Sequence, residues 1–258
     1  MRLKNALTVG AFGLAAGVLA VPASGTIIFT GTGTGEAGGT VSGSASFSLS
    51  GSTLTLILAN TSAAHTGAQG DAITGIVFSI NGSGQTLSFT MSGAGCGPTL
   101  PSGSHIFTDK TTQNDATALC GAGGSSWTNA FTPGGPVAAE FGVATTGFNG
   151  EFNGGSIGIG NASPDYGIVA PGTFPTATFG GSKFPFIQNA LEFQFTTGGT
   201  SFTEADITGV NFLVGTSGAD HFLGDCCVQR ETPEPDSLAL AGLAGLLLAF
   251  AGRRRAQS

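Results

Sequence analysis

Two neighbouring segments alternate apolar and polar residues, and this period of two constrains the fold more than any other feature of the sequence. In Val41–Leu49 the apolar residues share one face with serines opposite, and in Thr53–Ala59 leucines recur at every second position. The aligned apolar positions are Val41, Ala45, Phe47 and Leu49 in the first segment and Leu54, Leu56 and Leu58 in the second. The short link between the two segments contains Gly51-Ser52, a two-residue turn. Because successive side chains of a strand point to opposite faces, we expect a β-hairpin that buries one face.

Other short segments carry the same strand chemistry. They are Thr26–Thr30, Ile73–Ile80, Thr86–Met91, Ala138–Thr145, Ser156–Ile159, Tyr166–Val169, Leu191–Phe195 and Ile207–Val214. We expect Ile73–Ile80 and Thr86–Met91 to form a second hairpin around Asn81–Gly84. The Gly/Thr run from Gly31 to Gly39 is expected to be a connector or a bulged edge. Strands at this spacing, with few helix formers and no βαβ rhythm, predict an all-β fold, a β-sandwich or a jelly-roll-like single domain.

The segment Gly93–Pro136 shows no period and is rich in Gly, Pro, Thr and Ser. A stretch of this length without a pattern is typical of a surface excursion. A short helix is expected near Asp115–Leu119.

The N-terminus has the three parts of a secretory signal peptide. Arg2 and Lys4 form a positive region, Ala6–Ala20 is apolar, and Val21-Pro22-Ala23 supplies the small residues of a cleavage site. The sequence therefore predicts a leader at residues 1–23 and an exported domain at 24–231. This domain is long enough for one sizeable core.

The C-terminus combines a stiff polar tripeptide, an uncharged apolar run and a basic cluster. Pro233, Glu234 and Pro235 precede the run Ser237–Gly252, and Arg253, Arg254 and Arg255 follow it. Sixteen residues reach about 24 Å as a helix, slightly less than the ~30 Å hydrocarbon core, and arginine side chains can snorkel across the difference. We therefore expect residues 232–258 to carry a transmembrane helix, with the arginines as its cytoplasmic anchor.

This order of parts resembles the PEP-CTERM sorting signal, over about a tenth of the chain. The resemblance implies that an exosortase-type enzyme is the partner that recognises the tripeptide and processes the tail. It also implies a precursor held in the inner membrane by its C-terminal helix, then a surface or extracellular protein of a Gram-negative bacterium that makes exopolysaccharide. The resemblance says nothing of the fold of the exported part.

The exported part is strongly acidic. Residues 24–231 hold three cations, Lys110, Lys183 and Arg230, against thirteen acidic residues, a net charge near −10. No basic patch is available to meet phosphates, so nucleic acid is not expected as a partner.

Four cysteines in an exported chain predict disulfides. Cys96 and Cys120 lie in Gly-rich segments, and a bridge between them would close a loop of about 25 residues worth roughly 3 kcal/mol. Cys226 and Cys227 are adjacent, so they would form a strained bridge with each other or one would pair elsewhere. All three connectivities remain open, and we favour the Cys96–Cys120 pair.

No pattern in the sequence predicts catalysis. His65 and His105 lie in Gly/Ser/Thr-rich stretches expected to be loops, and neither a G-x-S-x-G elbow nor an H-E-x-x-H motif is present. We therefore expect a protein that is not an enzyme, without a cofactor.

Residue types in the sequence could suit four kinds of binding site, for a transition metal, calcium, a sugar or ice. The cluster Asp220, His221, Asp225, Cys226 and Cys227 offers metal-ligand types, but we interpret it as a solvated loop with oxidised thiols, and no metal site is expected. Carboxylates suited to calcium are dispersed over loops, at Asp71, Asp109, Asp115, Glu204 and Asp206. Aromatic residues beside Asn or Asp, as sugar sites use, occur at Trp127-Thr128-Asn129 and Asp165-Tyr166. The Thr-x-Thr run at Thr30–Thr34 has no later period, so an ice-binding solenoid is not indicated.

The sequence thus predicts an exported, surface-sorted, non-enzymatic β-domain of the envelope or exopolysaccharide matrix. The alternative is a secreted carbohydrate-binding or carbohydrate-active protein on the same β-sandwich.

Overall fold

The structure is a computed structural model, and part of the chain is described in it. The described residues are 25–35, 38–63, 69–82, 86–89, 98–107, 113–114, 120–121, 124–125, 127, 139–145, 166–172, 185–198, 201–215 and 221–227. Strands and two 3₁₀ turns account for their regular structure, which confirms the all-β class.

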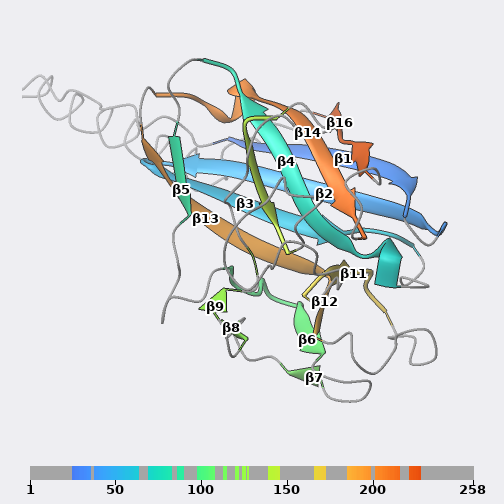
Figure 1. The fold of residues 1–258 in the computed structure, drawn as a ribbon. Coiled ribbons are helices and arrows are strands. Elements are labelled where there is room, and N and C mark those ends of the chain that lie inside the picture. The colour runs from blue at the N-terminus through green and yellow to red at the C-terminus, as the bar shows by residue number, and fades with distance from the viewer. Residues whose placement is uncertain are drawn as a thin grey trace, which may run out of the picture.

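The longer strands form two sheets that face each other (Figure 1). One is six-stranded, in the order β16-β1-β2-β3-β13-β5. Its strands are β1 (Thr26–Thr34), β2 (Thr40–Ser50), β3 (Thr53–Asn60), β5 (Thr86–Phe89), β13 (Ala190–Gly198) and β16 (Asp225–Cys227).

The other sheet is eight-stranded, in the order β15-β14-β4-β11-β12-β6-β7, with β10 also paired to β4. Its strands are β4 (Ile73–Ile80), β6 (His105–Phe107), β7 (Gln113–Asn114), β10 (Phe141–Ala144), β11 (Ile168–Val169), β12 (Phe186–Gln188), β14 (Ile207–Val214) and β15 (His221–Leu223). The remaining strands, β8 (Cys120–Gly121) and β9 (Gly124–Ser125), pair with each other. The 3₁₀ turns are η1 (Gln69–Asp71) and η3 (Glu204–Asp206).

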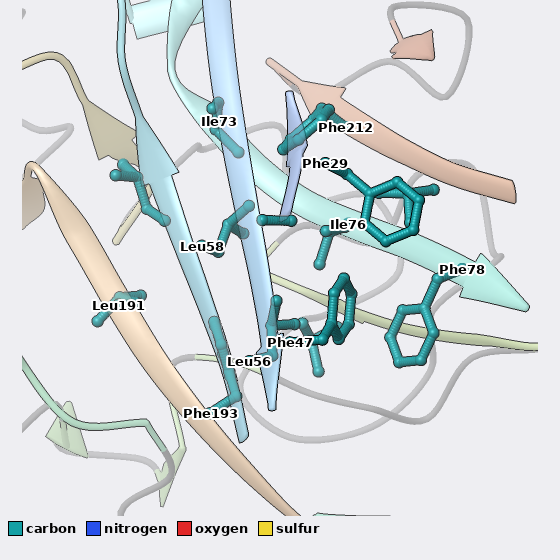
Figure 2. Close-up of a cluster of buried hydrophobic side chains, with 14 of the residues drawn as sticks. Phe29, Phe47, Leu56, Leu58, Ile73, Ile76, Phe78, Leu191, Phe193 and Phe212 are labelled. Atoms are coloured by element: carbon teal, nitrogen blue, oxygen red, sulfur yellow. The ribbon is translucent and has the colours of Figure 1, made fainter. Parts of the chain in front are cut away.

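Aromatic and aliphatic side chains from both sheets meet in one core (Figure 2). Phe47 of β2 is fully buried, and its ring lies 5.0 Å from that of Phe78 on β4 and 5.9 Å from that of Phe29 on β1. Both pairs have the edge-to-face arrangement that aromatic rings prefer. The two sheets are thus held together by the apolar faces that the alternating pattern predicts, as in a β-sandwich.

The first predicted hairpin is confirmed. β2 and β3 pair in antiparallel register up to Ser50 and Thr53, which leaves Gly51-Ser52 as a two-residue turn. Gly51 has φ +58°, whereas Ser52 has no positive φ. A positive φ at the first central residue alone is the pattern of a type II′ turn, which glycine favours.

The second predicted hairpin is wrong. β4 pairs with β14 in the eight-stranded sheet, whereas β5 pairs with β13 at the edge of the six-stranded sheet. The segment between β4 and β5 therefore passes from one sheet to the other. Both strands still turn apolar residues inward, because Ile76 is fully buried and Leu87 packs partly buried against the same core. A period of two shows which face of a strand is buried but not which strand it pairs with.

The Gly/Thr run continues β1 as a regular strand from Gly31 to Thr34, so the expectation of a connector or bulge is wrong for these residues. Gly35, Gly38 and Gly39 do lie in the connection between β1 and β2. Pairing with β2 runs without a break from Thr26↔Ser48 to Thr34↔Thr40. Glycine is required on its inner face, since a Cβ at Gly33 would lie 2.6 Å from the Cβ of Phe222 on β15. The absence of side chains here lets a strand of the opposite sheet approach β1 closely.

The last strands close one side of the sandwich. β15 pairs with β14 in one sheet, and after Gly224 the chain continues as β16, which pairs with β1 in the other sheet. The N–H of Gly224 donates to the carbonyl of Val210 at 2.9 Å, which fixes this corner. The interpretation of the cluster around His221, Asp225, Cys226 and Cys227 as a solvated loop is therefore wrong, because these residues lie in strands β15 and β16.

The middle of the chain is partly built into the fold rather than lying wholly on the surface. Ile106 of β6 is buried, and the ring of Trp127 is 1% exposed and lies 5.1 Å from Phe193 of β13. The strand expected at Ala138–Thr145 is present as β10. The strand at Ser156–Ile159 and the helix near Asp115–Leu119 lie outside the described residues.

Candidate functional site

The predicted sorting segment follows directly on the last strand. β16 ends at Cys227, six residues before Pro233. Pro233, Glu234, Pro235, the run Ser237–Gly252 and the cluster Arg253, Arg254 and Arg255 lie outside the described residues, as does the leader at 1–23. Within the described ranges, no helix has the length and apolar character of a membrane span.

For three of the four cysteines, the structure describes the backbone position but not the side chain. Cys120 lies opposite Ser125 in the β8–β9 pair, and Cys226 and Cys227 lie opposite Phe29 and Ile28 of β1. Cys96 lies outside the described residues, and so do the side chains of the other three. The Cys96–Cys120 bridge stays a prediction.

The outer face of the six-stranded sheet is rich in hydroxyl groups, and Ile28, Ile57 and Ala59 also lie on it. Register aligns the hydroxyl groups in rows across the strands, one of which is formed by Ser50, Thr53, Thr196 and Ser88. Neighbouring hydroxyls bond to each other where the side chains meet, as Thr32 Oγ1 and Ser42 Oγ do at 3.0 Å. The residues of this hydroxyl face are Thr26, Thr30, Thr32, Thr34, Thr40, Ser42, Ser44, Ser46, Ser48, Ser50, Thr53, Thr55, Thr86, Ser88 and Thr196.

Acidic groups are sparse on this face. Glu192 lies on the outward side of β13, and the exposed Asp225 lies opposite Thr30 at the β16 edge. The residues that the structure describes include no Lys or Arg anywhere. The face therefore offers mainly neutral donors and acceptors, since each hydroxyl can both donate and accept a hydrogen bond.

The carboxylates considered for calcium have structural roles where the structure describes them. Asp71 is 5% exposed, and its Oδ1 accepts from the N–H of Gly39 in the β1–β2 loop at 3.2 Å. Glu204 accepts from the N–H of Leu49 at 2.8 Å, and Asp206 accepts from both the N–H and the hydroxyl of Thr203. Asp109 and Asp115 are outside the described residues.

No cluster of three or more His, Cys, Asp or Glu that would suit a metal occurs among the described residues. His221 and Asp225 of the weighed cluster belong to different sheets, because the corner at Gly224 separates them. His105 lies in strand β6 opposite Gln188, so our expectation of a loop there is wrong. His65 and Asp220 are outside the described part.

The two aromatic candidates for sugar binding, Trp127 and Tyr166, pack in or against the hydrophobic core. Trp127 is buried against Phe193, so its indole packs in the core instead of facing a ligand. Tyr166 packs partly buried against the core at a backbone φ of +63°. Sequence reasoning missed the hydroxyl face. The serines opposite the apolar residues of β2 indicated part of this face in the sequence. That the hydroxyl groups of five strands line up beside each other follows only from the order of the strands in the sheet.

The described residues thus define a two-sheet, all-β sandwich that ends six residues before a polar, proline-bounded tripeptide. Residues 231–255 match the family model of the PEP-CTERM protein-sorting motif. This confirms the resemblance drawn from Pro233, Glu234, Pro235 and the arginine cluster. The motif indicates a precursor that is exported and sorted to the cell surface, and it implies an exosortase as the processing partner. Comparisons with curated proteins and with solved structures gave no match.

Proposed function

We propose that this protein is a non-enzymatic, surface-sorted β-sandwich of the envelope or exopolysaccharide matrix of a Gram-negative bacterium. An exosortase-type enzyme processes it at Pro233–Pro235 while the C-terminal helix holds the precursor in the inner membrane. The sorting motif at residues 231–255 is the observation that carries this proposal.

The chemistry of the tripeptide suits recognition by an enzyme. Two prolines fix φ and provide no backbone N–H, so Glu234 lies in a stretch that cannot extend a helix. The carboxylate of Glu234 is then presented on a backbone of restricted conformation, which lowers the entropy lost on binding.

The test is a Glu234→Ala variant compared with Asp236→Ala, which removes the neighbouring carboxylate outside the tripeptide. Glu234→Ala leaves membrane insertion intact and blocks processing, whereas Asp236→Ala is processed at the wild-type rate. The measurement is the mass of the protein released at the surface. Normal release of Glu234→Ala at the wild-type mass would show that the tripeptide is only a linker.

The hydroxyl face favours a second function, carbohydrate binding. A broad, nearly uncharged array of hydroxyls can exchange neutral hydrogen bonds with a polysaccharide without desolvating ionised groups. Such binding is consistent with the proposed place in the matrix, because it would retain the released protein in the exopolysaccharide. Co-sedimentation of released protein with purified exopolysaccharide tests it, and turnover of the polysaccharide in the same assay would instead show an enzyme.

A further inference from the structure

Both ends of the sandwich leave it on the same side. β1 begins at Thr26, and β16 runs antiparallel to it, toward that same end, with Cys227 opposite Ile28. The β2–β3 turn at Gly51-Ser52 projects beyond this end, because Thr26 pairs with Ser48 and the turn follows Ser50. We call this the terminal end of the sandwich.

The linker from the terminal end to the sorting tripeptide is short. Pro233 lies six residues after Cys227, and a fully extended chain covers at most about 21 Å in that distance. Ile28, opposite Cys227, pairs with Ser46, and the five residues from Ser46 to Gly51 rise about 17 Å along the strand. Pro233 therefore extends at most about 4 Å beyond the Gly51-Ser52 turn.

The expected membrane helix begins a short distance after the tripeptide. Four residues join Pro233 to Ser237, where the membrane helix is expected to begin, and they span at most about 14 Å. The turn is then within roughly 18 Å of the hydrocarbon, less than two helix diameters of 10–12 Å each. A membrane enzyme that cleaves the tripeptide cannot fit into this space without contacting the domain.

The terminal end carries acidic groups. Glu204 and Asp206 of η3 lie there, since Glu204 bonds to the N–H of Leu49 and the carbonyl of Asp206 accepts from Asn81 after β4. Glu140 is exposed beside them, with its N–H bonded to the carbonyl of Phe78. A surface that meets this end is best matched when it is basic or neutral.

We propose that the terminal end of the sandwich, around the Gly51-Ser52 turn and η3, is a docking surface for the enzyme that processes the tail. The inference rests on the proposed function and adds the face through which the folded domain meets its partner. It follows that the length of the linker, more than its sequence, sets the rate of processing.

Linker-length variants of the full chain test this. Deletion of Val228–Arg230 removes about 10 Å of reach and draws Pro233 back behind the turn. We expect processing of the membrane precursor to be at least 10-fold slower. Replacement of the same three residues by Gly-Ser-Gly keeps the length and should leave the rate within about 2-fold. Protease resistance of each precursor in isolated membranes checks that the domain is folded.

Photo-crosslinking provides a second measurement that does not depend on a deletion. A photoreactive residue at the exposed Ser52 should crosslink to an epitope-tagged exosortase, whereas one at the exposed Ala63, at the opposite end, should not. Insertion of six Gly/Ser residues after Arg230 removes the proximity that the short linker imposes, so the Ser52 crosslink should persist if the enzyme docks on this end. Loss of the crosslink while processing continues would overturn the docking surface.

The outcomes separate the two proposals. A deletion variant processed at the wild-type rate, or equal crosslinking from Ser52 and Ala63, would overturn the docking surface. A wild-type protein that is never cleaved near Pro233–Pro235 would overturn the proposed function itself.

Discussion

For the substitution Gly43→Ala, the sequence pattern and the structure predict opposite changes in stability. Gly43 occupies an inward position of β2, in line with Val41 and Ala45. Glycine in the interior of a strand is destabilising by roughly 0.5–1 kcal/mol relative to alanine, so the pattern alone predicts that Gly43→Ala stabilises the protein. The structure predicts the opposite, because a Cβ at this position would lie 2.6 Å from Cδ1 of Phe212.

The magnitude follows from how firmly Phe212 is held. Its ring is fully buried and stacks on Phe222 at 5.1 Å, so it has little room to move away. Overpacking of such a site costs about 1–3 kcal/mol, which exceeds the gain from removing glycine. We expect a net loss of about 1–2 kcal/mol, or roughly 2–8 °C in Tm for a domain near 200 residues.

Thermal unfolding of the full-length protein measures this, followed by the fluorescence of Trp127, the single tryptophan, which is buried on Phe193. Ser44→Ala, at the next position on the outward face, should change Tm by no more than the equivalent of about 0.5 kcal/mol. The double variant Gly43→Ala/Phe212→Leu should show a favourable coupling of at least about 0.5 kcal/mol, since the smaller side chain relieves the clash. A Gly43→Ala variant more stable than the wild type would refute the close contact.

Two other predictions concern links across the fold. Asn60→Ala should lower the free energy of unfolding by about 1–3 kcal/mol, measured by denaturant titration. The reason is that the buried Asn60 side chain donates a hydrogen bond to the carbonyl of Ile168 in the other sheet at 3.1 Å and accepts one from the hydroxyl of Ser62. Stability within about 0.5 kcal/mol of the wild type would contradict it. Non-reducing peptide mapping should recover Cys96 joined to Cys120, and any linkage of Cys96 to the C-terminal cysteines would show that the bridge ties the last strand to the middle of the chain.

Sequence periodicity predicted individual strands well and their partners poorly. The β2–β3 hairpin was predictable because its turn is two residues long, which leaves one register that keeps the leucines inward. The same reasoning failed for β4 and β5, because a longer connection permits either a hairpin or a crossing to the opposite sheet. The solvated loop expected at His221–Cys227 failed similarly, since pairing of short edge strands depends on distant partners.

The sequence alone determined where this protein is sent. Pro233, Glu234, Pro235 and the arginine cluster belong to a linear sorting motif that is defined by residue order, so its meaning needs no tertiary contacts. Tertiary structure decided that Trp127 belongs to the core, that the hydroxyls of five strands share one face, and that β16 leaves the sandwich beside the start of β1. These properties depend on which strands pair, and pairing is set by burial of apolar faces between residues far apart in the chain, which no local pattern encodes.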